Sequence, residues 1–213
     1  MRAVIFDLDG TLADTLGDIA DAMNYVLAES SLPTHSDEDY RTWVGWGLQH
    51  LVDHALPLSA RDQGREFAAR FRRYYAEHLV VRTTPYPGVA ELLDQLAGRY
   101  VLGVLSNKPQ ALTTTMVDAL FSRWPFVDVV GARDDVPHKP DPTSAIALAQ
   151  RLGFEAEQCV FVGDSEVDME TALRANMRAI GVDWGFRDRT TLSDAGAHAV
   201  LGQPADLMQF LED

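Results

Sequence analysis

The 213-residue sequence has one cysteine and no long apolar run. A single thiol cannot form an internal disulfide, which suits a reducing cytosol, and the apolar neighbours of Cys159 predict a buried rather than a catalytic residue. No stretch of about 18 or more apolar residues occurs, so the sequence predicts no membrane span. The first expected strand begins at Ala3, which leaves no room for a signal peptide, and we expect a cytoplasmic protein.

Positive charge is also scarce, because 18 lysines and arginines face 32 acidic residues and the formal net charge is −14. This imbalance argues against binding to nucleic acid or to an anionic membrane. A site for an anionic substrate must therefore carry its own local positive charge. The composition, 46% hydrophobic and 23% charged, is typical of a globular chain. The length suits one domain, or a core domain with a smaller insert, and we expect a monomer or a weak homodimer.

Two aspartates follow the first apolar run. Ala3–Phe6 are too few residues for a helix and predict a short strand buried on both faces. Asp7 and Asp9 come next, and side chains two residues apart in an extended chain point the same way. Gly10 permits a sharp turn. Alone, this motif could be an ordinary strand with an acidic turn. If the carboxylates are buried together, a shared proton or a metal ion must compensate their repulsion.

Residues 15–82 show helical spacing of apolar residues and no strand pattern. Asp14 or Thr15 is placed to cap the first helix, and Ser36 with Asp39 resembles a capping box. Ser59 is placed to cap the last and longest helix of this block. The expected helices of the block are Leu16–Glu29, a short helix ending near Val44, Leu48–Leu56, and a helix from Ser59 to Leu79.

The pattern changes after the proline-rich segment 83–88, where strands and helices alternate. Such alternation predicts right-handed crossovers and a parallel sheet. We therefore predict an α/β fold: a Rossmann-like core formed by residues 1–14 and 83–213, with an inserted all-helical cap at 15–82. The expected strands are 101–105, 127–130, 159–162 and 179–182, and the expected helices are 89–97, 110–120, 143–152, 166–175 and 204–211.

Polar side chains end two of the later strands. Ser106, Asn107 and Lys108 follow one, and Asp164 follows another, with Asp168 one turn into the next helix. Each group alone is typical of a turn or a helix cap. In an open α/β sheet, however, the active crevice lies beyond the carboxyl ends of the strands. The order of these groups therefore predicts one site at that edge of the sheet.

The expected site combines several carboxylates with a lysine. Lys139 lies in a proline-rich, stiff loop rather than on a mobile surface helix. Hard carboxylate oxygens suit Mg²⁺, which also keeps waters and substrate phosphate oxygens, and a lysine supplies a point charge for a phosphate. Mg²⁺ with Lys139 would make the pocket electropositive inside an acidic protein. The acids expected there are Asp7, Asp9, Asp164 and Asp168.

On these motifs the sequence resembles the haloacid dehalogenase-like hydrolase superfamily. The resemblance covers the whole chain. The helical insert is similar to the cap of the subgroup with phosphoglycolate phosphatases, β-phosphoglucomutases and small pyrophosphatases, and segments 43–47 and 182–186 look most like phosphoglycolate phosphatases. The residues that carry the four motifs are Phe6–Leu12, Ser106 within 105–107, Lys139 with Pro140, and 163–165 with Asp168.

The resemblance implies a mechanism through an aspartyl phosphate. Asp7 would attack phosphorus, and Asp9 would protonate the leaving alcohol and then activate water. Mg²⁺ would sit on Asp7, the backbone carbonyl of Asp9 and Asp164. Asp168 would support the metal waters or Lys139, and Thr11 would orient Asp7.

The substrate implied is a small phosphorylated metabolite, with 2-phosphoglycolate as the first choice. Ser106, Asn107 and Lys139 would bind the transferring phosphoryl group. Gly45 and Trp46 could reach into the site from the cap, or Trp43 and Trp46 could simply pack between cap helices. Five arginines look like a basic face of the cap, one of which could meet a substrate carboxylate: Arg65, Arg70, Arg72, Arg73 and Arg82.

Two other functions remain open from the sequence. A β-phosphoglucomutase-like phosphomutase or a pyrophosphatase fits the same motifs, since no residue shows how water is kept from the aspartyl phosphate. In a different class, the acidic pocket could be a non-catalytic phospho-acceptor, as in receiver domains. Asp9 and the long helical insert argue against that alternative, because a switch needs a long-lived acyl phosphate.

Overall fold

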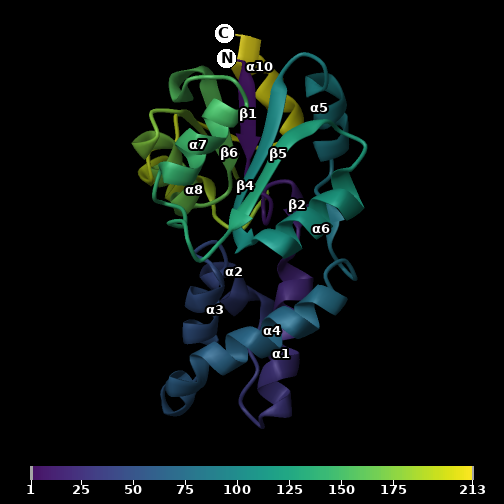
Figure 1. The fold of residues 1–213 in the computed structure, drawn as a ribbon, viewed down its shortest axis with the longest axis vertical. Coiled ribbons are helices and arrows are strands. Elements are labelled where there is room, and N and C mark those ends of the chain that lie inside the picture. The colour runs from purple at the N-terminus through teal and green to yellow at the C-terminus, as the bar shows by residue number, and fades with distance from the viewer. Residues whose placement is uncertain (1, 213) are drawn as a thin grey trace.

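The computed structural model describes residues 2–212 and has a six-stranded parallel sheet at its centre (Figure 1). The strand order is β5-β4-β1-β6-β7-β8, so β1 is central and pairs with β4 on one side and β6 on the other. The predicted α/β fold with a parallel sheet is therefore confirmed. The strands are β1 (Ala3–Phe6), β4 (Val101–Pro109), β5 (Phe126–Ala132), β6 (Cys159–Gly163), β7 (Arg178–Val182) and β8 (Ala199–Leu201).

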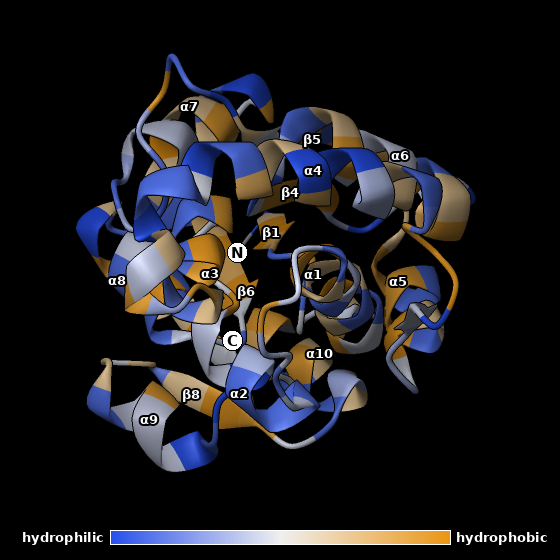
Figure 2. Cartoon of the chain, turned by 90° about the horizontal axis from the view of Figure 1, so that it is seen from below, coloured by the Kyte–Doolittle hydropathy of each residue, from blue (hydrophilic) through white to orange (hydrophobic). Residues whose placement is uncertain are grey.

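Helices cover both faces of this sheet, which explains the unbroken apolar run of β1. Val4 and Phe6 pack into the core on the face of α5, α6 and α10, whereas Ala3 and Ile5 pack on the face of α7, α8 and α9. Figure 2 shows β1 in the apolar colour inside the molecule and α2 and α4 largely polar outside it. The helices are α5 (Val89–Leu96), α6 (Gln110–Phe121), α7 (Thr143–Arg151), α8 (Glu166–Arg174), α9 (Arg189–Asp194) and α10 (Leu207–Glu212).

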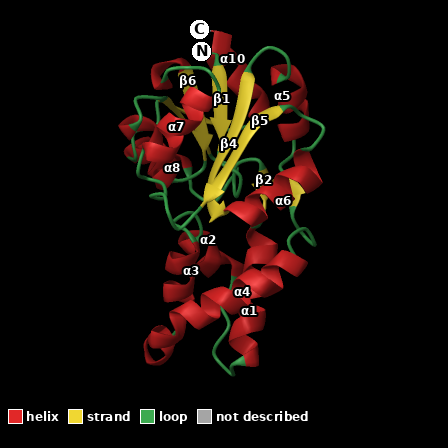
Figure 3. Ribbon diagram, viewed as in Figure 1, coloured by secondary structure: helices red, strands yellow, loops and turns green. Residues whose placement is uncertain are grey.

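Four further helices form the opposite end of the molecule, which contains only helices and loops (Figure 3). The long helices α1 and α4 pack on each other around buried aromatic residues, among them Phe67, Phe71 and Tyr75. The predicted capping box of α2 is confirmed, since Ser36 and Asp39 bond each other's backbone N–H. The helices are α1 (Leu16–Glu29), α2 (Asp37–Trp43), α3 (Leu48–Ala55) and α4 (Gly64–Glu77).

One predicted helix start and one predicted capping bond are wrong, whereas α1 begins at Leu16 as predicted. Ser59 does not cap α4, because a 3₁₀ helix (Leu58–Gln63) precedes that helix. Only Ala60 is buried in this segment, so it lacks the apolar face that would extend α4. Asp14 lies in a short strand and Thr15 makes no capping hydrogen bond at the start of α1. The Thr15 hydroxyl is buried and has no hydrogen-bond partner among the described residues.

The shortest elements were not predicted. These are α9, β8 and a two-residue antiparallel pairing of β2 (Ala13–Asp14) with β3 (Thr84–Pro85). Two or three residues are too short for an apolar period to be detected, and α9 (Arg189–Asp194) buries only Leu192. The last expected helix is in fact a 3₁₀ turn (Pro204–Asp206) followed by α10. The prediction that Cys159 is buried is confirmed, and burial raises the pKa of its thiol to about 11. Among the described residues, no helix combines the length and the apolar character needed to cross a bilayer.

The two chain segments that connect the helical end with the sheet are fastened side by side. Besides the β2–β3 pairing, the Asp18 carboxylate on α1 accepts hydrogen bonds from the backbone N–H groups of Val81, Arg82 and Thr83, each at 2.9 Å. The Thr83 hydroxyl donates a further bond of 2.7 Å. Burial raises the pKa of Asp18, but the bonds from Thr83 and the backbone outweigh this effect and lower it overall.

We therefore expect Asp18→Asn to lower the free energy of unfolding by about 2–3 kcal/mol at pH 7, because it removes a charged acceptor from buried donors. A lowered pKa gives stability that is present above the unfolded value of 3.8 and is lost as the pH falls through the folded pKa. The difference between wild type and variant, measured by urea unfolding, should therefore shrink below about pH 4.

Asp21→Asn is the matched control, because Asp21 forms only an exposed ion pair with Arg82. It should cost less than about 1 kcal/mol. Equal effects of the two substitutions would show that Asp18 does not hold the connection together.

Candidate active site

Three buried carboxylates meet at the carboxyl ends of β1 and β6. Asp7 directly follows β1, Asp164 follows β6, and Asp168 lies in the first turn of α8. Each has one carboxylate oxygen within 4.8 Å of the others, and all three are at most 5% exposed. The sequence predicted this convergence correctly, because adjacent parallel strands bring their ends to one edge of the sheet.

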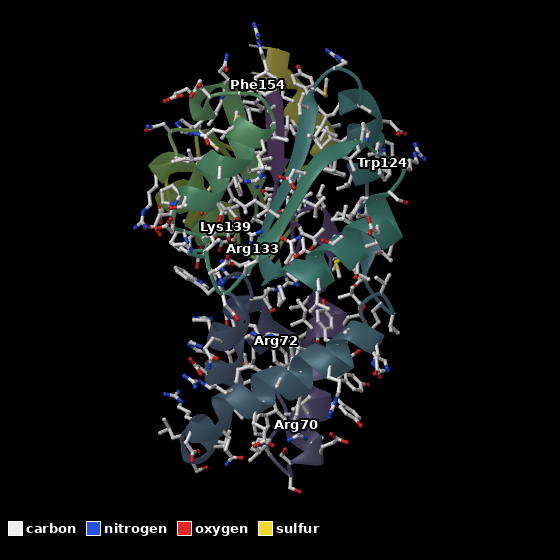
Figure 4. All side chains as sticks on the ribbon, in the orientation of Figure 1. Arg70, Arg72, Trp124, Arg133, Lys139 and Phe154 are labelled. Atoms are coloured by element: carbon white, nitrogen blue, oxygen red, sulfur yellow. The ribbon has the colours of Figure 1, made fainter. Side chains whose placement is uncertain are left out.

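Lys139 lies in the loop before α7 (Figure 4), and its ammonium faces two of these acids. Its Nζ donates a hydrogen bond of 2.6 Å to Asp168 Oδ1 and lies 2.9 Å from Asp7 Oδ1 as an ion pair. The bond to Asp168 is the better directed of the two, since Asp7 Oδ1 lacks a hydrogen bond of good geometry. Burial lowers the pKa of Lys139, but Asp168 and Asp7 outweigh this and raise it overall, so the ammonium stays charged.

One ammonium does not balance three carboxylates. Burial raises the pKa of Asp7 to about 7 against the opposing charge of Lys139, and Asp168 adds repulsion. Burial also raises the pKa of Asp164 well above its ordinary value, again with repulsion from Asp168 and Asp7. A divalent cation fits this cluster, because hard carboxylate oxygens lie close together with an excess of negative charge.

Glycine is required on both sides of Asp164. A Cβ atom on Gly10, which has φ +85°, would lie 2.2 Å from Asp164 Oδ2, and a Cβ on Gly185 would lie 2.3 Å from the Gly10 carbonyl oxygen. The loop after β1 and the loop after β7 therefore both approach the carboxylate closely. This approach explains Gly10 better than turn geometry alone.

Thr11 was expected to orient Asp7, and the structure corrects this. Its hydroxyl donates a 3.0 Å hydrogen bond to Asp164 Oδ1, and the backbone N–H of Phe186 donates to Asp164 Oδ2 at 2.8 Å. The turn at Gly10 carries Thr11 toward β6, away from the end of its own strand. Asp164 is therefore the carboxylate that the surrounding loops hold in place.

Ser106 and Asn107 lie in the last part of β4 and are both buried. The Asn107 side-chain amide donates to the carbonyls of Gly45 and Lys139, each at 3.0 Å, and its oxygen accepts from the Lys139 N–H at 2.9 Å. Its side chain thus links β4 to the Lys139 loop and to the loop of the helical end. The Ser106 hydroxyl oxygen accepts a 3.3 Å bond from the backbone N–H of Lys108.

Lys108 is a site residue to which the sequence gave no role. Its Nζ donates to Asp9 Oδ1 at 2.9 Å and to the hydroxyl of Tyr75 at 2.7 Å. Burial lowers the pKa of Lys108, but Asp9 and Tyr75 outweigh it and raise it overall. Burial raises the pKa of Tyr75 to about 12, so its hydroxyl is protonated at neutral pH. The available signal was the position of Lys108 at a strand end, two residues after Ser106.

The helical end contributes the loop around Gly45, but not Trp46, to the site. The Trp46 indole N–H points to Glu166 on α8 at 3.4 Å, and the side chain is partly exposed. Trp43 packs against His35 and Tyr40 inside the helical end, as the alternative interpretation held. Of the expected pair, only Gly45 lines the cavity described below.

The basic face expected on the helical end does not reach the acids. Arg70 lies far from Lys139 (Figure 4) and bonds Ser30, Glu29 and a carbonyl of α1. Arg82 pairs with Asp21 and Asp37.

A cavity of about 60 Å³ lies between the two ends of the molecule. Polar groups from the sheet line one side of it and apolar side chains from the helical end line the other, among them Ile19, Leu51 and Phe71. One water molecule needs about 10–15 Å³ of such a cavity, so the cavity holds only a few waters. The cavity is therefore small.

A known protein family matches most of this chain. Residues 4–182 match the family model of the haloacid dehalogenase-like hydrolases. The chain belongs to this family.

Relatives of similar length support the assignment. The phosphoglycolate phosphatase of Rhodospirillum rubrum is 36% identical over 99% of this chain and 90% of its own. That of Aquifex aeolicus is 32% identical over 100% of this chain and 98% of its own. The crystal structure of a predicted phosphoglycolate phosphatase from Haemophilus somnus superimposes with a TM-score of 0.91 at 28% identity, over 99% of this chain and 97% of that one.

The raised pKa of Asp7 makes the stability of this hydrolase depend on pH, and a divalent cation bound at the cluster would compete with the proton. Between the unfolded value of 3.8 and about 7 the folded state binds the extra proton, so this contribution to stability falls as the pH rises. Because a metal ion replaces that proton, 10 mM Mg²⁺ should raise the Tm by about 3–10 °C at pH 8 and by less at pH 5.

Asp164→Asn should remove most of the Mg²⁺-dependent rise, which thermal unfolding with and without Mg²⁺ measures. Asp135→Asn is the matched control, because it removes an exposed carboxylate outside the cluster. A rise of the same size in wild type and Asp164→Asn would mean that the metal binds elsewhere.

Proposed function

We propose that the protein is a Mg²⁺-dependent phosphatase of small phosphate monoesters. The observation that supports this best is the buried meeting of Asp7, Asp164 and Lys139 at one edge of the sheet. It provides a nucleophile, an acidic cluster suited to a divalent cation and a fixed positive charge. Asp7, Asp164 and the backbone carbonyl of Asp9 are the groups that would hold Mg²⁺. Mg²⁺ supplies charge that lets a carboxylate approach an anionic phosphoryl group.

In the first half of the reaction, a carboxylate oxygen of Asp7 attacks phosphorus while the ester P–O bond breaks. Asp9 gives its proton to the leaving alcohol oxygen, which departs as the free alcohol. Lys139 and the Ser106 hydroxyl bind oxygens of the transferring phosphoryl group. Asn107 and Asp168 position Lys139 from its backbone and its ammonium group, respectively.

In the second half, Asp9 takes a proton from water, and the water oxygen attacks phosphorus. The bond between phosphorus and Asp7 breaks, which releases inorganic phosphate and regenerates the carboxylate. We propose that residues 15–82 act as a cap over the site during these steps. The apolar side chains that this block places over the cavity support that role, since they exclude bulk water.

The preferred substrate is 2-phosphoglycolate, which the names of the full-length relatives support. The small volume of the cavity also favours a small ester over a sugar phosphate. The phosphomutase and pyrophosphatase alternatives have no observation of their own in their favour. The receiver-like alternative loses support because the family is one of hydrolases.

The proposal predicts Mg²⁺-dependent release of phosphate from 2-phosphoglycolate and from p-nitrophenyl phosphate. Asp7→Asn should reduce turnover below detection while circular dichroism shows an unchanged fold, because the amide cannot act as the nucleophile. With β-glucose 1-phosphate, no 6-phosphate should form. An active Asp7→Asn variant would require another nucleophile.

Asp9→Ala tests the proton-transfer role separately. We expect turnover of 2-phosphoglycolate to fall by roughly 10²–10⁴-fold, because an alkoxide would have to leave without a proton. The loss should be smaller with p-nitrophenyl phosphate, whose phenolate leaves without help. Rapid quench with ³²P-labelled substrate would show whether the aspartyl phosphate forms slowly or persists. Normal turnover of both esters would rule out Asp9 as the acid.

A further inference from the structure

The chain has two lysines, Lys108 and Lys139, and its other basic side chains, histidine aside, are arginines. Both lysines are buried at the site, with side chains 3% and 2% exposed, and both pair with its aspartates. Lys139 faces Asp7, where the phosphoryl group is transferred. Lys108 faces Asp9 and lines the cavity, so it lies on the side toward which the alcohol part of the ester departs.

Stability alone does not explain why the Lys108 ammonium is buried. Removing a positive charge from water is costly and is repaid only by close partners. The Lys108 ammonium has two hydrogen-bond partners, Asp9 and the Tyr75 hydroxyl, and lies 4.5 Å from the centre of the Tyr75 ring. The side chain can donate three hydrogen bonds, so it can accept one more partner.

The Tyr75 hydroxyl also has capacity for an anion. It accepts the hydrogen bond from Lys108, and among the described residues no acceptor is found for its own proton. Tyr75 belongs to α4 in the cap, whereas Lys108 belongs to β4 in the sheet. Two donors, one from each end of the molecule, therefore meet at the cavity wall.

We propose that Lys108 and Tyr75 bind a carboxylate carried by the alcohol part of the substrate. The proposal rests on the proposed phosphatase function and specifies its substrate class, a short phosphorylated carboxylic acid. Ser106 and Lys108 are two residues apart in one strand, about 6–7 Å along it. A carboxylate and a phosphate joined through one or two carbons span that distance.

Competing cations in the cap do not take this role. Arg70 and Arg82 are engaged with acids of the cap itself. Among the residues that line the cavity, Lys108 is the one with a positive charge. A negatively charged group in the cavity would therefore meet Lys108 first.

The test compares 2-phosphoglycolate with ethyl phosphate, in which a methyl group replaces the carboxylate. The measured quantity is the ratio of the two kcat/KM values, because any effect of Lys108 through Asp9 acts on both esters and cancels. Wild type should prefer 2-phosphoglycolate by about 100-fold or more. Lys108→Met should reduce the ratio to below about 5, mainly through KM, and Tyr75→Phe should reduce it by about 5–10-fold.

Arg72→Met is the matched control, because it removes one positive charge from the exposed side of α4 (Figure 4) and should leave the ratio unchanged. A wild-type ratio near 1 would overturn the carboxylate site and leave the phosphatase function intact. An unchanged ratio in Lys108→Met would also overturn it, since Lys108 would then act only on Asp9. Failure of wild type to hydrolyse either ester would instead count against the phosphatase function.

A binding measurement decides the proposal without turnover. Protein labelled with ¹⁵N-lysine should give two Nζ signals, since the chain has two lysines. In the Asp7→Asn background with Mg²⁺, 2-phosphoglycolate should shift both signals, and ethyl phosphate only that of Lys139. Lys108→Met identifies the second signal by its loss. A Lys108 signal that 2-phosphoglycolate does not move would overturn the proposal.

Discussion

The contact on which the site depends is that of the Lys139 ammonium with Asp7 and Asp168. It places one positive charge among three buried carboxylates. The cluster therefore keeps an excess of negative charge, and the attraction to the ammonium holds its members together. The fold keeps this unfavourable arrangement because each member is held by a different rigid element: the end of β1, the first turn of α8 and the loop that Asn107 fastens. The remaining negative charge makes the cluster suited to a divalent cation and an anionic ester together.

The arrangement of the chain explains how a small site is both rigid and closable. Its chemistry lies on the sheet, while the apolar wall of the cavity comes from the helical block between β1 and β4. The two connections to that block run side by side, through the β2–β3 pairing and the bonds that Asp18 accepts. If residues 15–82 act as the proposed cap, a block joined at one place can tilt without disturbing the acids, and the Asn107 bond to Gly45 joins it to the sheet in this structure.

The sequence predicted the elements and side chains whose positions depend on residues close by in the chain. An unbroken apolar run before Asp7 identified β1, and the strand end before Asp164 placed that residue at the same edge of the sheet. The Lys108 site could not be found in this way, because its partner Tyr75 lies 33 residues earlier on a helix whose orientation only packing decides. The family resemblance assigned Thr11 to Asp7, yet the turn at Gly10 brings it to Asp164, 153 residues away. Elements as short as β8 have no period to detect.

Arginine and lysine are divided by location in this chain, and the division has a physical basis. A guanidinium is broad and presents several donors in a fixed plane, which suits the ion pairs that Arg70 and Arg82 make on the cap. An ammonium is a compact point charge on a flexible stem, which can enter a crowded pocket and exchange one oxygen partner for another. A chain of net charge −14 repels anions at a distance. Both ammonium groups are buried at the site, and we propose that this restricts their attraction to molecules small enough to enter it.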